Sequence, residues 1–382
     1  MRANHGTDYP LLFAPVRIAG LDLPNRLVMA PTAINFAKPD GTPSERQIEY
    51  YRMRAKGGVG LVIVEATFVR ADGRSFPASL GLDRDSQIPS FRKLTQAIHE
   101  GGARAGIQLV HTGRRGNPAI IGGQPIGPSP IPCPVRQLVP RELKGEEIPG
   151  LAQAFVAAAG RAQKSGFDLI CLHMAHGTLL HQFLTPLANQ RHDEYGGDLE
   201  GRMRLPLMVV CGVRECLGPG IALSCRISSE DGVEGGLRLA DTSRMAKELR
   251  TAGADLIDVS FGTQGSVPLT SPTEEAPLGC FVPFAETIRK AAGPPVIAVG
   301  KIWDPNLAEE IIRSGKADLI ALSRPLLADP ELPRKWKEGR LDEVRPCIAD
   351  NKGCLGRLYQ NLEVRCSVNP SLGHIDEGRP SS

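Results

Sequence analysis

The sequence predicts an α/β protein that closes as a (β/α)8 TIM barrel, and three observations carry this prediction. Eight short apolar segments rich in β-branched residues recur along the chain. Amphipathic helical patterns, such as the one over residues 88–102, lie between them. Glycine repeatedly stands where a helix ends and the next strand begins, which is typical of a helix C-cap. Almost wholly apolar strands that alternate with helices favour parallel β/α units.

The eight expected strands follow one another with room for a helix between most neighbours. A doubly wound open sheet is the alternative, but no G-x-G-x-x-G motif opens a helix after the first strand, which weakens it. We expect strands at residues 26–31, 61–67, 105–111, 168–175, 222–228, 255–262, 295–301 and 318–325.

Three segments fall outside this repeat. Residues 13–25 predict a short hairpin able to plug the floor of the barrel. Residues 112–148 form an insertion after the third strand, and a loop of this length is usually functional, so we expect it to shape a pocket with Arg114 and Arg115 near its mouth. We therefore divide the chain into a barrel over residues 1–340 and a cysteine-bearing extension over residues 341–382.

Composition narrows the class of partner. The 45 basic and 42 acidic side chains give a net charge of +3, which is too even to indicate nucleic acid or an anionic membrane. No apolar run of about 18 residues is present, and the first residues lack the apolar core of a signal peptide. We expect a cytoplasmic protein that acts on a small molecule. The nine cysteines are then expected to be thiols or metal ligands rather than disulfides.

The strand ends carry the candidate site, because active sites of such barrels lie at the carboxyl ends of the strands. Two dipeptides with one cation each, Gly300-Lys301 and Ser323-Arg324, end the seventh and eighth strands, where phosphate groups commonly bind. A surface salt bridge is the alternative use of these cations. Gln108 and Arg226 on two other strands suit a planar polar ring, since one offers a donor and an acceptor and the other a fixed positive charge. Together these residues predict a flavin mononucleotide (FMN).

His173 and His176 end the fourth strand. Zinc is one use for them, but helical zinc pairs are usually spaced four apart, and only His181, His192 and Asp193 stand nearby as further ligands. A packed core pair is a second alternative. We favour a third, in which both imidazoles donate hydrogen bonds to a substrate carbonyl as negative charge builds on its oxygen.

At this point the chain resembles the Old Yellow Enzyme family of flavin-dependent ene-reductases. The resemblance rests on "LFAPVRIAGLDLPNRLVMAP", "GGVGLVIVEAT", "IQLVHTGR" and "LSRPLLADPELPRKWKEGR", and above all on "HMAHGTLLHQFLTPLANQRHDEYGGDLEGRMR". It covers residues 10–373 and implies that His173 and His176 bind the activating carbonyl of the substrate. It also implies contacts to the flavin ring from Pro31, Thr32, Ala66, Gln108 and Arg226, and to its phosphate from Gly300, Lys301, Ser323 and Arg324.

The segment "RPCIADNKGCLGRLYQNLEVRCSVNP" resembles the iron–sulfur segment of the 2,4-dienoyl-CoA reductase and trimethylamine dehydrogenase branch. That branch has the pattern C-x2-C-x3-C-x11-C, in which four thiolates hold a [4Fe–4S] cluster. Cys347, Cys354 and Cys366 fall in register, while Asp350 takes the second position. A cluster held by three thiolates and one carboxylate is our first interpretation. A three-iron cluster and a lost cluster are the alternatives.

The chain departs from this family at two further positions. Thr178 stands where members usually carry a tyrosine that protonates the substrate, and an aliphatic alcohol is a poor general acid. Ala33 stands where trimethylamine dehydrogenase carries the cysteine that bonds its flavin, so the FMN is expected to dissociate.

The resemblance implies reduction of an activated C=C bond of an enone or enoyl thioester. Electrons would come from NAD(P)H, either directly or through the cluster from a separate FAD/NAD(P)H reductase subunit or electron-transfer protein. The alternatives are an oxidative flavoenzyme of the amine dehydrogenase or N-demethylase type, and a flavoprotein with altered catalysis. We also expect a homo-oligomer.

Overall fold

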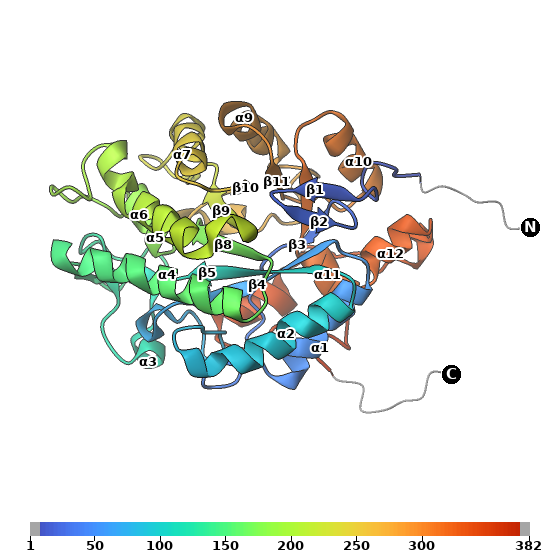
Figure 1. Cartoon of the computed structure of the whole chain (residues 1–382), viewed down its shortest axis with the longest axis horizontal. Coiled ribbons are helices and arrows are strands. Elements are labelled where there is room, and N and C mark those ends of the chain that lie inside the picture. Colours follow the sequence, from blue (N-terminus) through green and yellow to red (C-terminus); the bar gives the residue numbers. More distant parts are fainter. Residues whose placement is uncertain (1–7, 375–382) are drawn as a thin grey trace, which may run out of the picture.

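Residues 8–374 are described by a computed structural model, and their strands form a closed barrel (Figure 1). The strands follow the order β10-β11-β12-β3-β4-β5-β8-β9, and all neighbours are parallel. Each predicted strand segment overlaps one of them, so the predicted TIM barrel is confirmed. The barrel strands are β3 (Leu27–Met29), β4 (Leu61–Phe68), β5 (Arg104–Val110), β8 (Leu169–Met174), β9 (Ala222–Ser228), β10 (Leu256–Ser260), β11 (Val296–Ala298) and β12 (Leu319–Leu322).

Helices surround the barrel, and α4 and α6 lie side by side along one flank (Figure 1). The longer helices are α1 (Glu45–Lys56), α2 (Ile88–Glu100), α4 (Ile148–Lys164), α6 (Leu199–Leu217), α7 (Leu239–Thr251), α9 (Val282–Ala292) and α10 (Pro305–Arg313). The shorter ones are α3 (Pro118–Ile121), α5 (Leu179–Leu184), α8 (Val267–Thr270), α11 (Arg324–Ala328), α12 (Leu332–Lys337) and α13 (Arg357–Tyr359). No described helix has both the length and the apolar character needed to cross a membrane.

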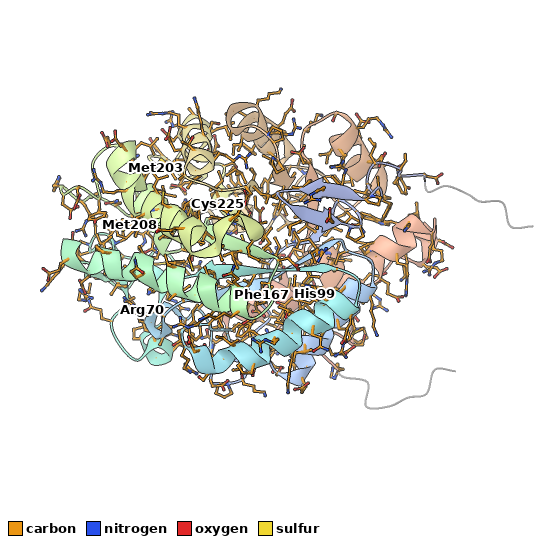
Figure 2. The ribbon with its side chains drawn as sticks, viewed as in Figure 1. Arg70, His99, Phe167, Met203, Met208 and Cys225 are labelled. Atoms are coloured by element: carbon orange, nitrogen blue, oxygen red, sulfur yellow. The ribbon has the colours of Figure 1, made fainter. Side chains whose placement is uncertain are left out.

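The predicted hairpin closes the floor of the barrel. It consists of β1 (Val16–Ile18) and β2 (Leu21–Leu23), which pair antiparallel. Its Ile18 and Leu21 are buried in one cluster with the inward side chains of β4 and β8. Outside the strands, side chains fill the space beneath the helices, as at Phe167, which is labelled in Figure 2. Phe167 packs against Phe91 with ring centroids 6.3 Å apart. The open end of the barrel is therefore the end at which the strands finish.

The insertion over residues 112–148 carries its own small parallel sheet, β6 (Ile126–Gly127) with β7 (Arg141–Glu142). The expectation for Arg114 was wrong. Its side chain is buried and donates to the carbonyls of Ile131 and Leu187, at 3.3 Å each, so it fastens the insertion to the barrel.

The described part of the C-terminal extension packs on the barrel. The Val364 N–H donates to the carbonyl of Ile34 at 3.0 Å, and the Asn369 side chain donates to the carbonyl of Leu327 at 2.8 Å. A π-helical turn over Lys352–Gly356 leads into α13. Residues 375–382 of the predicted extension lie outside the described residues.

Candidate active site

A cavity of about 240 Å³ opens at the carboxyl ends of the strands. All of the predicted flavin and phosphate residues line it, and so do both candidate histidines. These residues are Pro31, Thr32, Ala66, Gln108, His173, His176, Arg226, Gly300, Lys301, Ser323 and Arg324. Because they come from most of the barrel strands, only the closed barrel brings them together.

The two histidines lie edge to face. Their ring centroids are 5.3 Å apart and their planes meet at 76°. His173 is on β8, and its buried Nδ1 has no protein partner. His176 follows the strand with a φ of +57°, and its Nε2 lies 2.7 Å from the hydroxyl of Ser260. The left-handed backbone at His176 turns its ring toward the cavity instead of continuing the strand.

Both imidazoles are neutral near pH 7. Burial lowers the pKa of His173 well below its ordinary value, and the charges of Arg226 and Arg115 lower it further. Burial also lowers the pKa of His176, with His173 and Arg226 as the next causes. A neutral imidazole has one N–H donor and one acceptor, so each ring offers a single hydrogen bond to a ligand oxygen.

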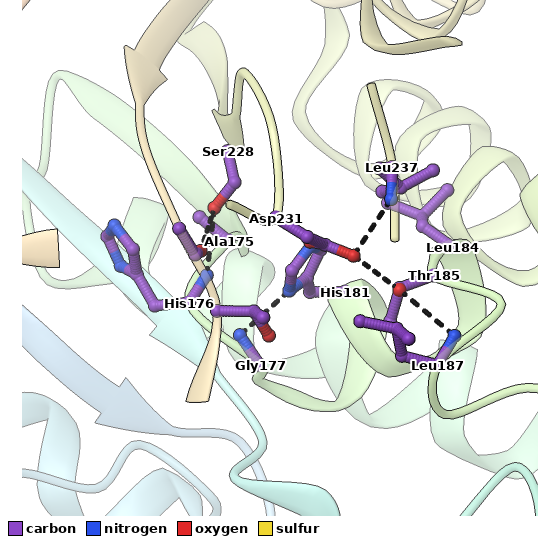
Figure 3. A network of polar contacts seen from close by, with 12 residues as sticks. Ala175, His176, Gly177, His181, Leu184, Thr185, Leu187, Ser228, Asp231 and Leu237 are labelled. Atoms are coloured by element: carbon purple, nitrogen blue, oxygen red, sulfur yellow. Dashed lines mark hydrogen bonds and ion pairs between the residues drawn. The ribbon is translucent and has the colours of Figure 1, made fainter. Parts of the chain in front are cut away.

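A buried polar network supports the turn that carries His176 (Figure 3). The Gly177 N–H donates to Nδ1 of His181 at 2.8 Å, and Nε2 of His181 lies 2.9 Å from a carboxylate oxygen of Asp231. The other carboxylate oxygen accepts from the Thr185 hydroxyl at 2.5 Å and from the Leu237 N–H at 3.0 Å. Burial raises the pKa of Asp231, but its three partners, His181, Thr185 and Leu237, lower it below its ordinary value, so the carboxylate is ionised.

Arg226 lies on β9 against the floor of the cavity. It donates to Asp258 on β10 at 2.8 Å, and both side chains are buried. Burial raises the pKa of Asp258, which the charge of Arg226 opposes. Gln108 on β5 approaches the sulfur of Cys171 at 3.6 Å. The planar amide and guanidinium both line the cavity and give this part of it a polar surface.

A β-bulge turns Ala66 into the cavity. The register of β4 against β5 shifts between Val64 and Thr67, which lets Glu65 point outward to α1. There Glu65 accepts from the side chain of Gln47 at 2.5 Å and from the Ile34 N–H at 3.0 Å. Burial raises its pKa to about 8, so this carboxyl group holds a proton at neutral pH. Glu65 thereby fastens the loop after β3.

The backbone after β11 has an unusual shape. Gly300 has a φ of +116° and Lys301 a φ of +51°, which ends the strand earlier than predicted. Their N–H groups donate to no acceptor within the described part of the chain. Adjacent unpaired N–H groups form a concave anion site. The Lys301 ammonium donates to the carbonyls of Thr273, at 3.1 Å, and Glu274, at 2.8 Å, so it ties down the loop after β10.

The neighbouring strand completes this side of the cavity. The Ser323 hydroxyl lies 2.7 Å from that of Thr32, which joins the ends of β12 and β3. Arg324 stands over the ring of Trp303 at 5.1 Å and donates to Asn351 at 2.7 Å. The β11–β12 side thus combines two cations with free backbone donors.

Thr178 lines the cavity, but its hydroxyl is already engaged. It lies 2.9 Å from the carbonyl of His173 and 3.0 Å from the carbonyl of Ala175, as donor to both. The single hydroxyl proton is therefore directed at the backbone and not at a ligand, which agrees with its weak acidity.

A smaller cavity lies beside the first and is lined by Cys347, Asp350, Cys354 and Cys366. Cys354 and Arg324 border both cavities. Asp350 accepts from the Ser367 hydroxyl at 2.7 Å and from the Lys352 N–H at 3.2 Å.

No group of three or more histidine, cysteine or acidic side chains within residues 8–374 stands close enough to hold a metal ion. The zinc alternative for His173 and His176 is not supported, because His181 serves the Asp231 network and Asp193 pairs with Arg191 at 2.9 Å.

The profile of the NADH:flavin oxidoreductase / NADH oxidase family matches residues 11–343. The chain belongs to this family. A relative is the NADH oxidase of Thermoanaerobacter brockii, 45% identical over 96% of this chain and 57% of that protein. The cinnamate reductase of Clostridium sporogenes is 35% identical over 97% of this chain and 59% of that protein.

Among solved structures, a 2-naphthoyl-CoA reductase in complex with 2-naphthoyl-CoA superposes with a TM-score of 0.92 at 32% identity. The match covers 96% of this chain and 58% of that one. The chain therefore spans somewhat over half the length of each of these three relatives.

The cavity of this NADH:flavin oxidoreductase family member fits FMN. The adjacent unpaired N–H groups of Gly300 and Lys301 suit a phosphate, and Gln108 and Arg226 suit the polar edge of the flavin ring. Ala33 offers no atom for a covalent flavin bond.

Sequence reasoning missed Asp258 and Ser260 on β10 and the aromatic wall formed by Phe281 and Trp303. The strand-end rule applied to residues 255–262 would have identified the first two. The aromatic residues lie in loops with no periodic signal.

Proposed function

We propose that this protein uses FMN to reduce a C=C bond conjugated to a carbonyl group. The observation that carries the proposal is the pair of neutral imidazoles, His173 and His176, inside the cavity that fits the flavin. Bound FMN supplies the hydride chemistry. The names of the cinnamate reductase and 2-naphthoyl-CoA reductase relatives identify unsaturated or aromatic carbonyl compounds as their substrates.

The two histidines hold the substrate oxygen. The unpaired Nδ1 shows that His173 makes no protein contact that would have to break there, and Ser260 orients the ring of His176. As the carbonyl becomes enolate-like, two N–H donors stabilise the charge on its oxygen more than they stabilise the neutral ground state. Because the Thr178 hydroxyl is engaged with backbone carbonyls, we propose that water protonates the α-carbon.

The charge of the cavity favours this direction over amine oxidation. Four cations line the cavity, Arg115, Arg226, Lys301 and Arg324, and none of its described lining residues is acidic. Such a lining attracts anions and repels an ammonium substrate.

The second part of the proposal concerns the supply of electrons. We propose that Cys347, Cys354, Cys366 and Asp350 hold an iron–sulfur cluster in the smaller cavity. Each ligand of a cluster would bind a different iron atom, so these side chains would not have to meet around one metal ion, for which they are not close enough. Electrons would come from NAD(P)H, directly or through a reductase partner. The small cavity supports this assignment because it lies beside the flavin site and shares Cys354 with it.

The deciding experiment follows the flavin absorbance of FMN-loaded protein without oxygen. After reduction by dithionite, an enone such as 4-phenylbut-3-en-2-one is expected to restore the oxidised spectrum. If amines bleach the oxidised flavin instead and no unsaturated carbonyl compound reoxidises the reduced form, the proposed direction is wrong.

Iron analysis of anaerobically purified protein tests the cluster separately. We expect iron with a broad absorbance that dithionite bleaches, and we expect Asp350→Cys to alter that absorbance and raise iron retention. Protein that holds flavin but no iron, with no response to Asp350→Cys, would leave only the ene-reductase part of the proposal.

A further inference from the structure

Arg115 lies beside the histidine pair without a charged partner. It ends the short turn after β5, lines the main cavity, and donates to the carbonyl of His176 at 3.2 Å. It forms no ion pair with a carboxylate anywhere in residues 8–374. A guanidinium has five N–H donors, so this contact leaves most of its hydrogen-bonding capacity unused.

The other cations of the cavity are committed elsewhere. Arg226 is paired with Asp258, and Lys301 and Arg324 belong to the β11–β12 side, which suits the flavin phosphate. Arg115 instead stands with a second cation, because the side chain of Arg136 donates to its carbonyl at 2.8 Å. The charge of Arg115 adds to burial in lowering the pKa of Arg136. No carboxylate neutralises the charge of Arg115, and its partly exposed guanidinium lines the cavity, so it is available to an anion bound there.

We infer that Arg115 binds the carboxylate of an unsaturated acid, and this inference rests on the proposed function. A conjugated carboxylate has two equivalent oxygens. With one oxygen on the histidine pair, the second is directed to the guanidinium that lies against His176. A charge-assisted bond of this kind is stronger than a bond between neutral groups.

A coenzyme A thioester does not explain this placement. Its phosphates are separated from the thioester carbonyl by the whole pantetheine arm, so they cannot lie next to the histidines while the carbonyl is bound there. A simple enone has a neutral carbonyl group and would leave Arg115 uncompensated. The acid group is therefore the ligand that uses both the imidazoles and the cation.

The test measures binding without any redox step. FMN-loaded protein is titrated with 3-phenylpropanoate and with its neutral counterpart 4-phenylbutan-2-one, and the dissociation constants are read from the flavin absorbance. We expect Arg115→Gln to weaken the carboxylate roughly 10- to 100-fold and the ketone less than about 3-fold. Arg115→Lys keeps the charge and is expected to recover part of the loss. Arg136→Gln removes a cation that does not line the cavity, and is expected to have an effect of less than about 3-fold.

Three results would overturn the inference. One is that the wild-type protein does not bind 3-phenylpropanoate, another is that Arg115→Gln weakens both ligands equally, and the third is that Arg136→Gln matches Arg115→Gln. FMN content and thermal unfolding of each variant verify that it is folded. If reduced wild-type protein is still reoxidised by 4-phenylbut-3-en-2-one, only the role of Arg115 fails. If that reaction is also absent, the proposed function fails with it.

Discussion

The two sides of the main cavity are built by different means. On the β8–β10 side, His176 and the turn that carries it are held by side-chain contacts that reach buried residues such as Asp231. On the β11–β12 side, the backbone itself makes the site, through positive φ angles and free N–H groups at Gly300 and Lys301.

This difference follows from what each side is suited to hold. A phosphate accepts from any N–H group, so a correctly shaped backbone is sufficient. A carbonyl that gains charge during a reaction needs donors fixed in one direction, and fixing a side chain requires partners behind it. We therefore expect the β8–β10 side to be sensitive to the removal of side chains, and the β11–β12 side to be sensitive to the addition of a single methyl group.

The largest effect is expected from replacing both histidines by alanine. The substrate oxygen would lose its two donors, and removal of such donors typically slows a reaction by about 10³-fold. Stopped-flow reoxidation of the reduced flavin by an enone measures the rate, and binding of a phenolate measures the ligand site. FMN content should stay close to that of the wild type. His99→Ala, a surface histidine bound to Asp168, is the matched control. Unchanged reoxidation would remove the histidines from the mechanism.

The next largest effect concerns the network behind His176. Asp231→Ala would leave the Thr185 hydroxyl, the Leu237 N–H and His181 without their buried acceptor. Breaking a buried pair in this way is expected to lower the free energy of unfolding by about 3 kcal/mol. Thr185→Val removes one donor together with its need for a partner, so about 1 kcal/mol is expected. Urea unfolding monitored by circular dichroism measures the free energy of unfolding of the wild type, Asp231→Ala and Thr185→Val. Equal stability of all three proteins would contradict the structural role of the network.

The sequence predicted which side chains line the cavity better than it predicted the residues that support them. Strand ends converge in any barrel, so His173, Gln108 and Arg226 could be assigned from order along the chain. Glu65 and Gln47 contact each other only because a bulge turns Glu65 outward, and an irregularity of that kind has no periodic signature. Arg114 and Arg115 look equivalent in sequence, yet Arg114 is buried against the insertion and Arg115 lines the cavity. They are neighbours in one short turn, so their side chains leave the backbone in different directions.

Glu65 offers a pH-dependent test of the loop after β3. Its pKa is raised from 4.5 to about 8 in the folded protein, so the folded state keeps a proton that the unfolded state releases above about pH 4.5. The contribution of Glu65 to the free energy of unfolding is therefore fully present below about pH 4.5 and is lost as the pH rises toward about 8. The linkage relation gives a loss of about 2 kcal/mol between pH 6 and pH 8.

Glu65→Gln should remove that pH dependence. Glu49→Gln, which changes a partly exposed residue of α1 that pairs with Arg52, should keep it. Urea unfolding at a series of pH values measures the three slopes. Parallel curves for the wild type and Glu65→Gln would show that the carboxyl group is ionised in the folded protein.

The smallest expected effect tests the backbone side of the comparison. A Cβ atom at Gly300 would lie 2.8 Å from the ring of Phe281, which is stacked on Phe261, and the φ of +116° disfavours any L side chain. Gly300→Ala is expected to weaken FMN binding by about 10-fold, because strain of this kind costs about 1–3 kcal/mol. Fluorescence of released FMN during dilution measures the affinity. Gly293→Ala introduces a methyl group at a φ of +77° with no atom within 4 Å, so it carries the backbone strain without the contact at the cavity. If both variants bind FMN as tightly as the wild type, the Gly300–Lys301 turn is not the phosphate site, and Ser323 and Arg324 must hold the phosphate without it.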